Sequence, residues 1–216
     1  SHELRTPLAV ICSAGENLAD GIAVSEDRVK RYGRLIAGEG RHLGEMVEEI
    51  LGYARGNKSP ERWERFDVID LAERALTASA AEIEASGCTV ERHFEEMPLR
   101  VEGEKRALIH AIRNLVSNAA KYGREGGWIG VSVKQRGAMV EIAVADRGPG
   151  FESGEGKKIF EAFHRGKRAL AEQVHGLGLG LTLVKRVAEM HGGRVEATSE
   201  NGTCFRLLVP LVKEAA

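Results

Sequence analysis

Two apolar helical stripes with a short break between them occupy the first 55 residues, and they constrain the fold more than any other feature. The first stripe consists of Leu4, Leu8, Ile11 and Leu18, with the small residue Gly15 between the last two. These five positions follow a 4-3-4-3 spacing, which is typical of one face of a helix. Between the stripes, Ser25 precedes Glu26 and Asp27, which is typical of a helix cap and an acidic first turn. The second stripe consists of Val29, Tyr32, Ile36, Leu43, Met46, Ile50 and Tyr53.

Two helices cannot enclose a hydrophobic core by themselves. The simplest cover for both stripes is a second hairpin from another copy of the chain, which gives a dimeric four-helix bundle. Gly56 ends the second helix, and the segment "GNKSPE" is typical of a linker. We therefore expect a dimerising hairpin over residues 1–56, a linker over 57–62 and a second domain over 63–213.

The second domain mixes helical and alternating patterns. Strands are expected in "CTVERHF" and "LRVEG", and two hairpins in "WIGVSVKQ" with "MVEIAVAD" and "RVEATS" with "CFRLLVP". Helices are expected over residues 67–86, 104–122 and 178–191. Helices mixed with antiparallel strands predict an α+β fold, here an α/β two-layer sandwich that follows the helical hairpin.

Composition excludes several classes of protein. A net charge of −1 gives no electrostatic case for binding nucleic acid or an acidic membrane. Cys12, Cys88 and Cys204 are odd in number and far apart, so we expect reduced, mostly buried thiols rather than metal ligands. The apolar runs are shorter than the roughly 20 residues of a membrane span, and no signal peptide is visible. Because the chain begins inside a predicted helix, we expect it to be a fragment.

One predicted helix carries a polar stripe opposite its buried face. At 100° per residue, four polar side chains of "EKRALIHAIRNLVSNAAKYG" share one arc: Asn114, Asn118, Lys121 and Tyr122. The apolar arc holds Leu108, Ile112, Leu115, Val116 and Ala119. A carboxamide oxygen is a neutral ligand for Mg²⁺, and a lysine attracts phosphate. Taken alone, the stripe is better explained as an ordinary solvated helix face.

Two glycine-containing segments follow. In "DRGPGF", Asp146 ends a predicted strand and can accept a hydrogen bond from an exocyclic amine, while Gly148 and Gly150 allow close approach to the backbone. The alternative is a plain turn. In "HGLGLGLTLVKRVAEMHGG", three glycines lead into a helix whose first amides can hold phosphates: Gly176, Gly178 and Gly180. Leu181 stands where a dinucleotide fingerprint has its last glycine, and no Walker loop is present.

The order of these segments resembles the sensor histidine kinases of bacterial two-component systems, over nearly all 216 residues. "SHELRTPL" resembles their H-box, "NLVSNAAKYG" the N-box, "DRGPGF" the G1 box, "IFEAFHRG" the F-box and "GLGLGL" the G2 box. The resemblance implies a dimerising hairpin with a phosphorylated histidine, followed by a Bergerat-type ATP-binding domain.

The resemblance also implies roles for single residues of the ATP-binding domain. Asn118 would bind Mg²⁺ with support from Asn114, Lys121 and Tyr122 would flank the phosphates and the nucleotide, and Asp146 would recognise the adenine amino group. Residues 152–175 would form a mobile lid with Arg165 aimed at the γ-phosphate and with Phe160 and Phe163 as apolar anchors. Two departures from the family pattern are Arg147 in place of an asparagine and His164 in place of a tyrosine.

The opening segment then gains a chemical interpretation. His2 lies about 160° from Leu4 around the helix, so it faces solvent, where its neutral imidazole can attack the γ-phosphate of ATP. Glu3 can accept a proton from the other ring nitrogen. Glu3 and Thr6 match the family's E-x-x-T pattern, in which the threonine positions a water for dephosphorylation of the regulator. The alternatives are a solvated histidine and a threonine that caps the helix bend at Pro7.

We therefore expect the core of an ATP- and Mg²⁺-dependent protein-histidine kinase. It would autophosphorylate His2, pass the phosphoryl group to an aspartate of a response regulator on a separate chain, and also act as a regulator phosphatase. The alternatives are a superfamily ATPase, although Asn114 stands where those enzymes have a glutamate base, and a nucleotide-binding pseudokinase or scaffold. The expected location is a cytoplasmic core whose parent protein can be anchored in the inner membrane by upstream segments.

Overall fold

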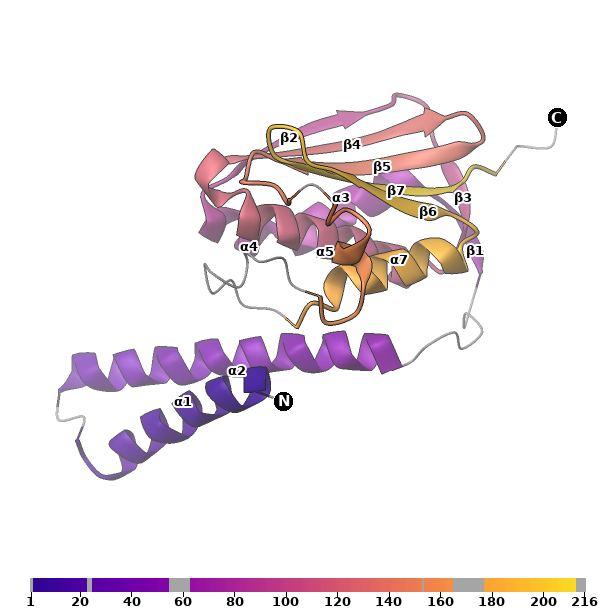
Figure 1. The fold of residues 1–216 in the computed structure, drawn as a ribbon. Helices are drawn as coiled ribbons and strands as arrows, with labels where there is room; N and C mark the ends of the chain where they lie inside the picture. Colours follow the sequence, from indigo (N-terminus) through magenta and orange to yellow (C-terminus); the bar gives the residue numbers. More distant parts are fainter. Residues whose placement is uncertain (1, 23–24, 55–62, 153, 165–176, 213–216) are drawn as a thin grey trace. The chain divides into compact units, whose positions relative to one another are not determined.

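The structure, a computed structural model, describes residues 2–22, 25–54, 63–152, 154–164 and 177–212 (Figure 1). The chain divides into two compact units: a pair of helices, and a larger unit that holds all the strands. Within the described residues, we find no helix that combines the length and the apolar character needed to cross a membrane.

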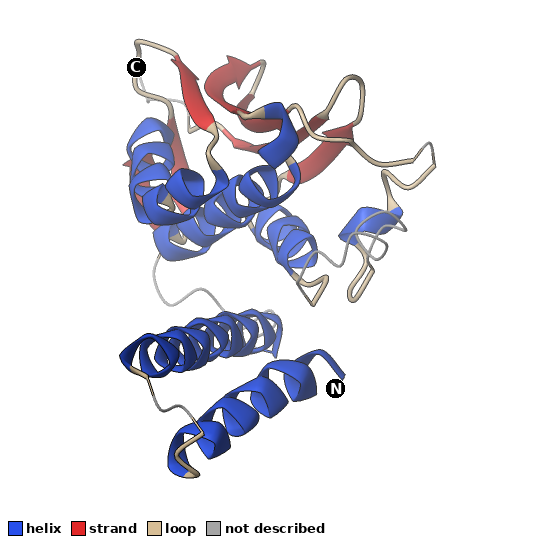
Figure 2. Ribbon diagram, turned by 90° about the vertical axis from the view of Figure 1, so that its left-hand side faces the viewer, coloured by secondary structure: helices blue, strands red, loops and turns tan. Residues whose placement is uncertain are grey.

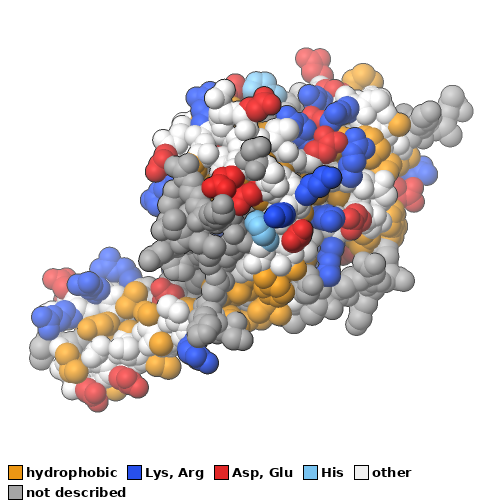
Figure 3. Space-filling model, viewed as in Figure 1, with side chains coloured by type: hydrophobic (Ala, Val, Ile, Leu, Met, Phe, Trp, Pro, Cys, Tyr) orange, Lys and Arg blue, Asp and Glu red, His pale blue; other side chains and the backbone are white. Residues whose placement is uncertain are grey.

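The first unit is the predicted helical hairpin, formed by α1 (His2–Ala19) and α2 (Glu26–Ala54). Pro7 and Ala14 are buried on α1, and Met46 is buried on α2. Other apolar side chains stay exposed on the hairpin, namely Leu8, Ile22, Val29, Leu35 and Val47. Figure 3 shows such hydrophobic side chains spread over the hairpin surface at lower left. One chain therefore buries only part of the apolar surface of its two helices.

The second unit contains a five-stranded sheet in the order β2-β4-β5-β7-β6, with helices against one face (Figure 2). The strands are β2 (Thr89–Phe94), β4 (Trp128–Arg136), β5 (Met139–Asp146), β6 (Arg194–Thr198) and β7 (Thr203–Pro210). The helices are α3 (Val68–Ala78), α4 (Ala80–Ser86), α5 (Lys105–Tyr122) and α7 (Gly180–Met190), with short 3₁₀ turns at Arg124–Gly126 and Lys158–Phe160. This arrangement is the predicted two-layer sandwich of a sheet and helices.

Side-chain alternation explains which face of the sheet the helices cover. On the central strands β4, β5 and β7, every second side chain is buried against the helices: Ile129, Val131, Val133, Val140, Ile142, Val144, Phe205, Leu207 and Val209. The apolar arc predicted on α5 is buried in the same core: Leu108, Ile112, Leu115, Val116 and Ala119. The polar stripe of α5 consequently lies away from the core.

The structure corrects three expectations about the elements. The helix predicted over residues 67–86 is two helices, separated at Ser79, whose φ of −99° and ψ of 4° interrupt the helical geometry. A short strand that was not predicted, β1 (Glu64–Asp67), pairs with β3 (Arg100–Gly103) in a separate two-stranded sheet. The strands are not all antiparallel, because β2 pairs with β4 in parallel. A parallel pair needs a long crossover, which here includes α5.

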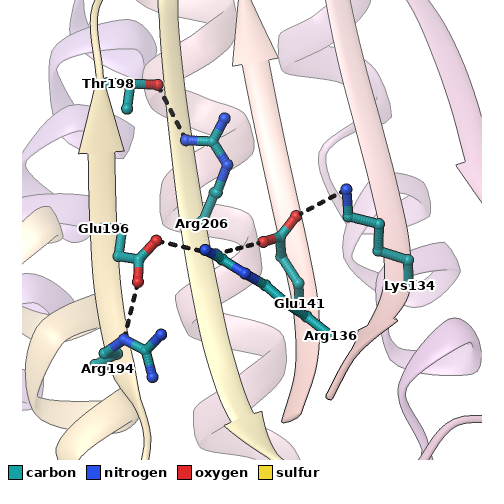
Figure 4. Close-up of polar contacts among 7 residues, drawn as sticks. All are labelled: Lys134, Arg136, Glu141, Arg194, Glu196, Thr198 and Arg206. Atoms are coloured by element: carbon teal, nitrogen blue, oxygen red, sulfur yellow. Dashed lines mark hydrogen bonds and ion pairs between the residues drawn. The ribbon is translucent and has the colours of Figure 1, made fainter.

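The face of the sheet without helices is covered by a network of charged side chains (Figure 4). Buried Glu141 accepts a hydrogen bond from Arg136 Nη1 at 3.0 Å and lies 3.3 Å from Lys134 Nζ. Arg136 also contacts Glu196, which Arg194 holds at 2.8 Å. The hydrogen bond from Arg194, together with the charge of Arg136, lowers the pKa of Glu196. The long stems of these cations cover the sheet while their charged groups stay in water.

The cysteines match the prediction only in part. All three are free thiols, but only Cys88 is buried, whereas Cys12 is exposed and Cys204 is half-buried. Cys204 lies on the charged face of the sheet, in register with Ala145 of β5.

Candidate functional site

The two predicted asparagines lie on the uncovered side of α5. Asn114 and Asn118 are both half-buried, and the structure gives neither carboxamide a hydrogen-bond partner among the described residues. A Cβ added to Gly180, the first residue of α7, would lie 3.8 Å from Oδ1 of Asn114. The asparagine stripe and the start of α7 are therefore neighbours, and the carboxamide oxygens are available to a ligand.

Asp146 ends β5 as predicted and is 4% exposed. Burial raises the pKa of its carboxyl, while hydrogen bonds from the backbone N–H of Gly148 and from Thr203 act in the opposite direction. The Gly148 N–H donates to Oδ1 at 2.8 Å. A Cβ added to Gly123, which ends α5, would lie 2.7 Å from the Asp146 Cβ. This places the carboxylate beside the last turn of the asparagine helix.

The turn after Asp146 packs tightly against Tyr122 on one side and Ser199 on the other. A side chain on Gly148 would collide with the backbone oxygen of Tyr122, and one on Gly150 would collide with Ser199 Oγ. Gly150 also has a φ of +72°, a region that L-residues rarely adopt. Ser199 Oγ accepts the N–H of Phe151 at 2.9 Å. In this structure, the space left by the absent side chains of Gly148 and Gly150 is filled by Tyr122 and Ser199 of the protein itself.

The glycines before α7 have different surroundings. Gly178 has a φ of +70°, and an added Cβ would lie 2.7 Å from the backbone oxygen of His164. Its own carbonyl oxygen accepts the N–H of Phe163 at 3.1 Å. Gly180 begins α7, so the first amides of that helix lie directly after this contact. Gly176 lies outside the described residues.

The "IFEAFHRG" segment only partly behaves as predicted. Phe160 is buried and meets Phe205 edge to face at a centroid distance of 6.3 Å, so this anchor is confirmed. Phe163 is 64% exposed and has a φ of 64°, so its prediction as an apolar anchor is wrong. Two buried polar atoms, Nδ1 of His164 in this segment and Oγ1 of Thr182 in the first turn of α7, have no hydrogen-bond partner among the residues that the structure describes.

Lys121 and Tyr122 lie in the last turn of α5. The ammonium of Lys121 lies 4.0 Å from Oε1 of Glu82 on α4, and the hydroxyl of Ser117 donates to the same oxygen at 2.6 Å. Sequence reasoning missed this contact because Glu82 lies 35 residues before Ser117 and belongs to no recognised motif, while Ser117 lies inside the N-box but has no predicted role there. Tyr122 is half-buried.

Arg147, the departure from the family's asparagine, makes a defined contact. Its guanidinium carbon lies 4.6 Å from the ring centroid of Trp128, and the indole Nε1 donates to Glu91 at 2.8 Å. The structure therefore turns this arginine toward β4 rather than leaving it unattached in the turn.

The other predicted residues are described only partly. α1 begins at His2, but the side chains of His2 and Glu3 lie outside the described residues, and Thr6 is exposed one turn later. Arg165 and most of the predicted lid also lie outside them. Within the described residues, no group of three acidic, histidine or cysteine side chains could hold a metal ion. The carboxamide oxygens of Asn114 and Asn118 are of the oxygen type that Mg²⁺ accepts as ligands.

Comparisons with known proteins agree with this arrangement. Residues 103–213, just over half of the chain, match the family described as "Histidine kinase-, DNA gyrase B-, and HSP90-like ATPase", and residues 1–59 match the "His Kinase A (phospho-acceptor) domain". Sensor-like histidine kinase SenX3 of Mycobacterium tuberculosis is 36% identical over 220 residues, which cover 100% of this chain and 53% of SenX3. The chain thus spans about half the length of that relative.

Solved structures share the fold. The mycobacterial sensor histidine kinase MprB is 28% identical with a TM-score of 0.60, over 71% of this chain and 100% of that one. Histidine kinase ThkA, solved in complex with the response regulator protein TrrA, is 23% identical with a TM-score of 0.73, over 98% of this chain and 59% of that one. With a phospho-acceptor domain followed by an ATPase domain, the chain belongs to the sensor histidine kinases of two-component systems.

Proposed function

We propose that this chain is the catalytic core of a kinase that autophosphorylates His2 with ATP and then phosphorylates an aspartate of a response regulator. The observation that carries the proposal is the convergence of three elements in one unit. Asn114 of α5, whose carboxamide has no hydrogen-bond partner among the described residues, lies beside the glycine that begins α7, and the last turn of α5 lies beside buried Asp146. The family to which the chain belongs supplies the ATP-binding and phospho-acceptor domains.

Each group of the site has a task that its chemistry suits. The Asp146 carboxylate accepts a hydrogen bond from the adenine amino group, while Gly148 and Thr203 keep its orientation. The first amides of α7 point at the phosphates, and Lys121 adds a positive charge. The carboxamide oxygen of Asn118 would be a ligand for Mg²⁺, with Asn114 in support. Mg²⁺, when bound, would screen the phosphate oxygens and hold them in a geometry suited to attack.

The phosphoacceptor chemistry belongs to the start of α1. A neutral His2 nitrogen forms the bond to the γ-phosphorus as the bond to the bridging oxygen breaks and ADP leaves. Glu3 removes the proton from the other ring nitrogen. We also assign to Thr6 the positioning of a water molecule for dephosphorylation of the regulator, which makes this kinase a regulator phosphatase as well. Because of its phospho-acceptor hairpin, we expect the chain to work as a homodimer.

A superfamily ATPase is the second candidate, and Asn114 argues against it. Those enzymes place a glutamate as the base for water one turn before the metal asparagine, and a carboxamide cannot accept that proton. Phosphoryl transfer to His2 needs no base at that position. The mutation tests below separate the two candidates.

The proposal is tested by incubating the protein with γ-labelled ATP and Mg²⁺. We expect label on the protein that is lost in acid and retained in alkali, which identifies a phosphoramidate. His2→Gln should bind ATP as the parent does and incorporate no label, because only the acceptor is removed. Asn118→Asp should reduce labelling by at least about tenfold, since it changes the charge and the ligand set of the metal.

Two results would contradict this assignment. Label on His2→Gln at the level of the parent would place the acceptor elsewhere. Steady release of inorganic phosphate by both the parent and His2→Gln, with no label on the parent, would favour the ATPase. Because His2 is the first residue of α1, the same assay is best repeated with additional upstream residues to prevent fraying of this turn.

A further inference from the structure

A single carboxylate on α4 contacts two residues of the asparagine helix. Oε1 of Glu82 accepts a hydrogen bond from Ser117 Oγ at 2.6 Å and lies 4.0 Å from Lys121 Nζ. The side chains of Glu82 and Lys121 are 40% and 37% exposed, so the pair is partly in water. Ser117 thus fixes the position of the carboxylate, while Lys121 is held only loosely.

Helix geometry places this contact at the border of the predicted phosphate site. Ser117 and Lys121 are four residues apart and share one side of α5, and Asn114 and Asn118 occupy the adjoining side. Among the described residues, Glu82 is the acidic group that the structure pairs with Lys121. The lysine that is expected to meet phosphate therefore has an anionic partner on its own protein.

An ammonium has one positive charge to share between a carboxylate and a phosphate. A partly exposed ion pair at 4.0 Å is weak, so phosphate oxygens can replace the carboxylate. The replacement is opposed by the lost contact with Glu82. Ser117 holds the carboxylate in place, so Glu82 cannot simply swing away from the lysine when phosphate arrives.

We propose that Glu82 is a positioning residue that competes with the nucleotide phosphates for Lys121 and so limits the affinity for ATP. This inference rests on the proposed function, because it takes Lys121 as a phosphate contact. It predicts that the kinase binds nucleotide less tightly than its asparagine stripe and α7 would allow, and that the restraint acts through one lysine.

The test measures binding of Mg·ATP by calorimetry to the parent and to four variants. Glu82→Gln keeps the shape and the hydrogen bond from Ser117 but removes the charge, and we expect binding about three- to fivefold tighter. Glu84→Gln makes the same change at an exposed position of the same helix and should leave the affinity unchanged. Lys121→Met should weaken binding, and adding Glu82→Gln to it should give a smaller gain than in the parent.

A melting curve for each variant separates a folding defect from an effect on the site. A merely structural role for Glu82 would lower the melting temperature and weaken binding, the opposite of the expected direction. Unchanged or weaker binding by Glu82→Gln in a parent that binds Mg·ATP overturns the inference and leaves the proposed function standing. An equal gain with and without Lys121 also overturns it, because the carboxylate would then act on the phosphates directly. A folded parent that does not bind Mg·ATP overturns the proposed function itself, and the inference with it.

Discussion

His191 joins two helices that carry the site. It ends α7, where its Nδ1 lies 2.7 Å from the carbonyl oxygen of Val187, and its Nε2 accepts the N–H of Glu104 at 2.9 Å, just before α5. Those partners assign the ring proton to Nδ1, so the imidazole is neutral. The ring of Trp63 lies 5.4 Å away, centroid to centroid. A single neutral side chain thus connects the end of the glycine-led helix to the start of the asparagine helix.

This arrangement predicts a pH dependence of stability. His191 is 4% exposed, and burial lowers its pKa, although Val187 and the charge of Glu104 favour the protonated form. Its pKa in the folded state therefore lies below the unfolded value, so His191 reduces stability as the pH falls below about 6.5. His191→Gln removes this titration, and we expect its unfolding free energy to fall less between about pH 7.5 and pH 5.5 than that of the parent.

Urea unfolding at the two pH values measures this difference. His93→Gln is the matched control, because it replaces an exposed histidine on β2 with the same side chain. It should preserve the pH dependence of the parent. A parent-like pH dependence in His191→Gln would show that other groups dominate acid sensitivity.

At the scale of elements, the turn after β5 can pack as it does only because Gly148 has no side chain. Gly148→Ala would place a Cβ against the backbone oxygen of Tyr122 and 2.8 Å from Asp146 Oδ1, and a backbone atom cannot yield as a flexible side chain does. We expect a loss of about 1–3 kcal/mol, the usual cost of overpacking. Thermal unfolding should show it as a Tm lower by roughly 2–4 °C for each kcal/mol.

Gly156→Ala is the matched control in the same segment. Its added Cβ would meet Phe151 at 3.5 Å, an ordinary contact, so we expect little change in Tm. An equal decrease in Tm from both substitutions would mean that the segment tolerates no added side chain, and that the close contact of Gly148 with Tyr122 is not the cause.

The elements that sequence predicted well are those whose pattern repeats over several turns or strand residues. Both hairpin helices, the β4–β5 and β6–β7 hairpins and the apolar arc of α5 are confirmed. The break at Ser79 was hidden because Ile83 follows Leu76 at a helical spacing of seven residues. β1 has only four residues, too few for alternation to show. Parallel pairing of β2 with β4 is a long-range choice that local patterns do not record.

The site was predictable to the extent that its residues belong to motifs. Asn114, Asn118, Asp146 and Gly180 lie where their motifs placed them relative to helix and strand ends, and their roles stay predictions. Contacts from outside the motifs were not predictable, such as Glu82 on Ser117 or Thr203 on Asp146. Such partners are brought together only by packing.

For the whole molecule, the two units differ in how completely they bury their own apolar surface. The larger unit encloses a continuous core around α5 and the central strands, with an ion-pair network over the other face of its sheet. The hairpin has no such closure, since Leu8 and Ile22 are 53% and 51% exposed. Exposed apolar groups of this kind on a two-helix unit favour burial against another copy.

Dimerisation should therefore depend on apolar residues of the hairpin. Sedimentation of the parent should give about twice the 23.5 kDa of one chain. Leu8→Glu combined with Leu35→Glu places charge where we expect the second copy to pack, and should shift the protein toward the monomer by at least about tenfold in dissociation constant, because burying an unpaired charge is costly. Arg41→Glu changes a polar, exposed position of α2 and should leave the dimer intact. A parent that stays monomeric at tens of micromolar, with its hairpin helical by circular dichroism, would require that another surface covers Leu8, Val29 and Leu35.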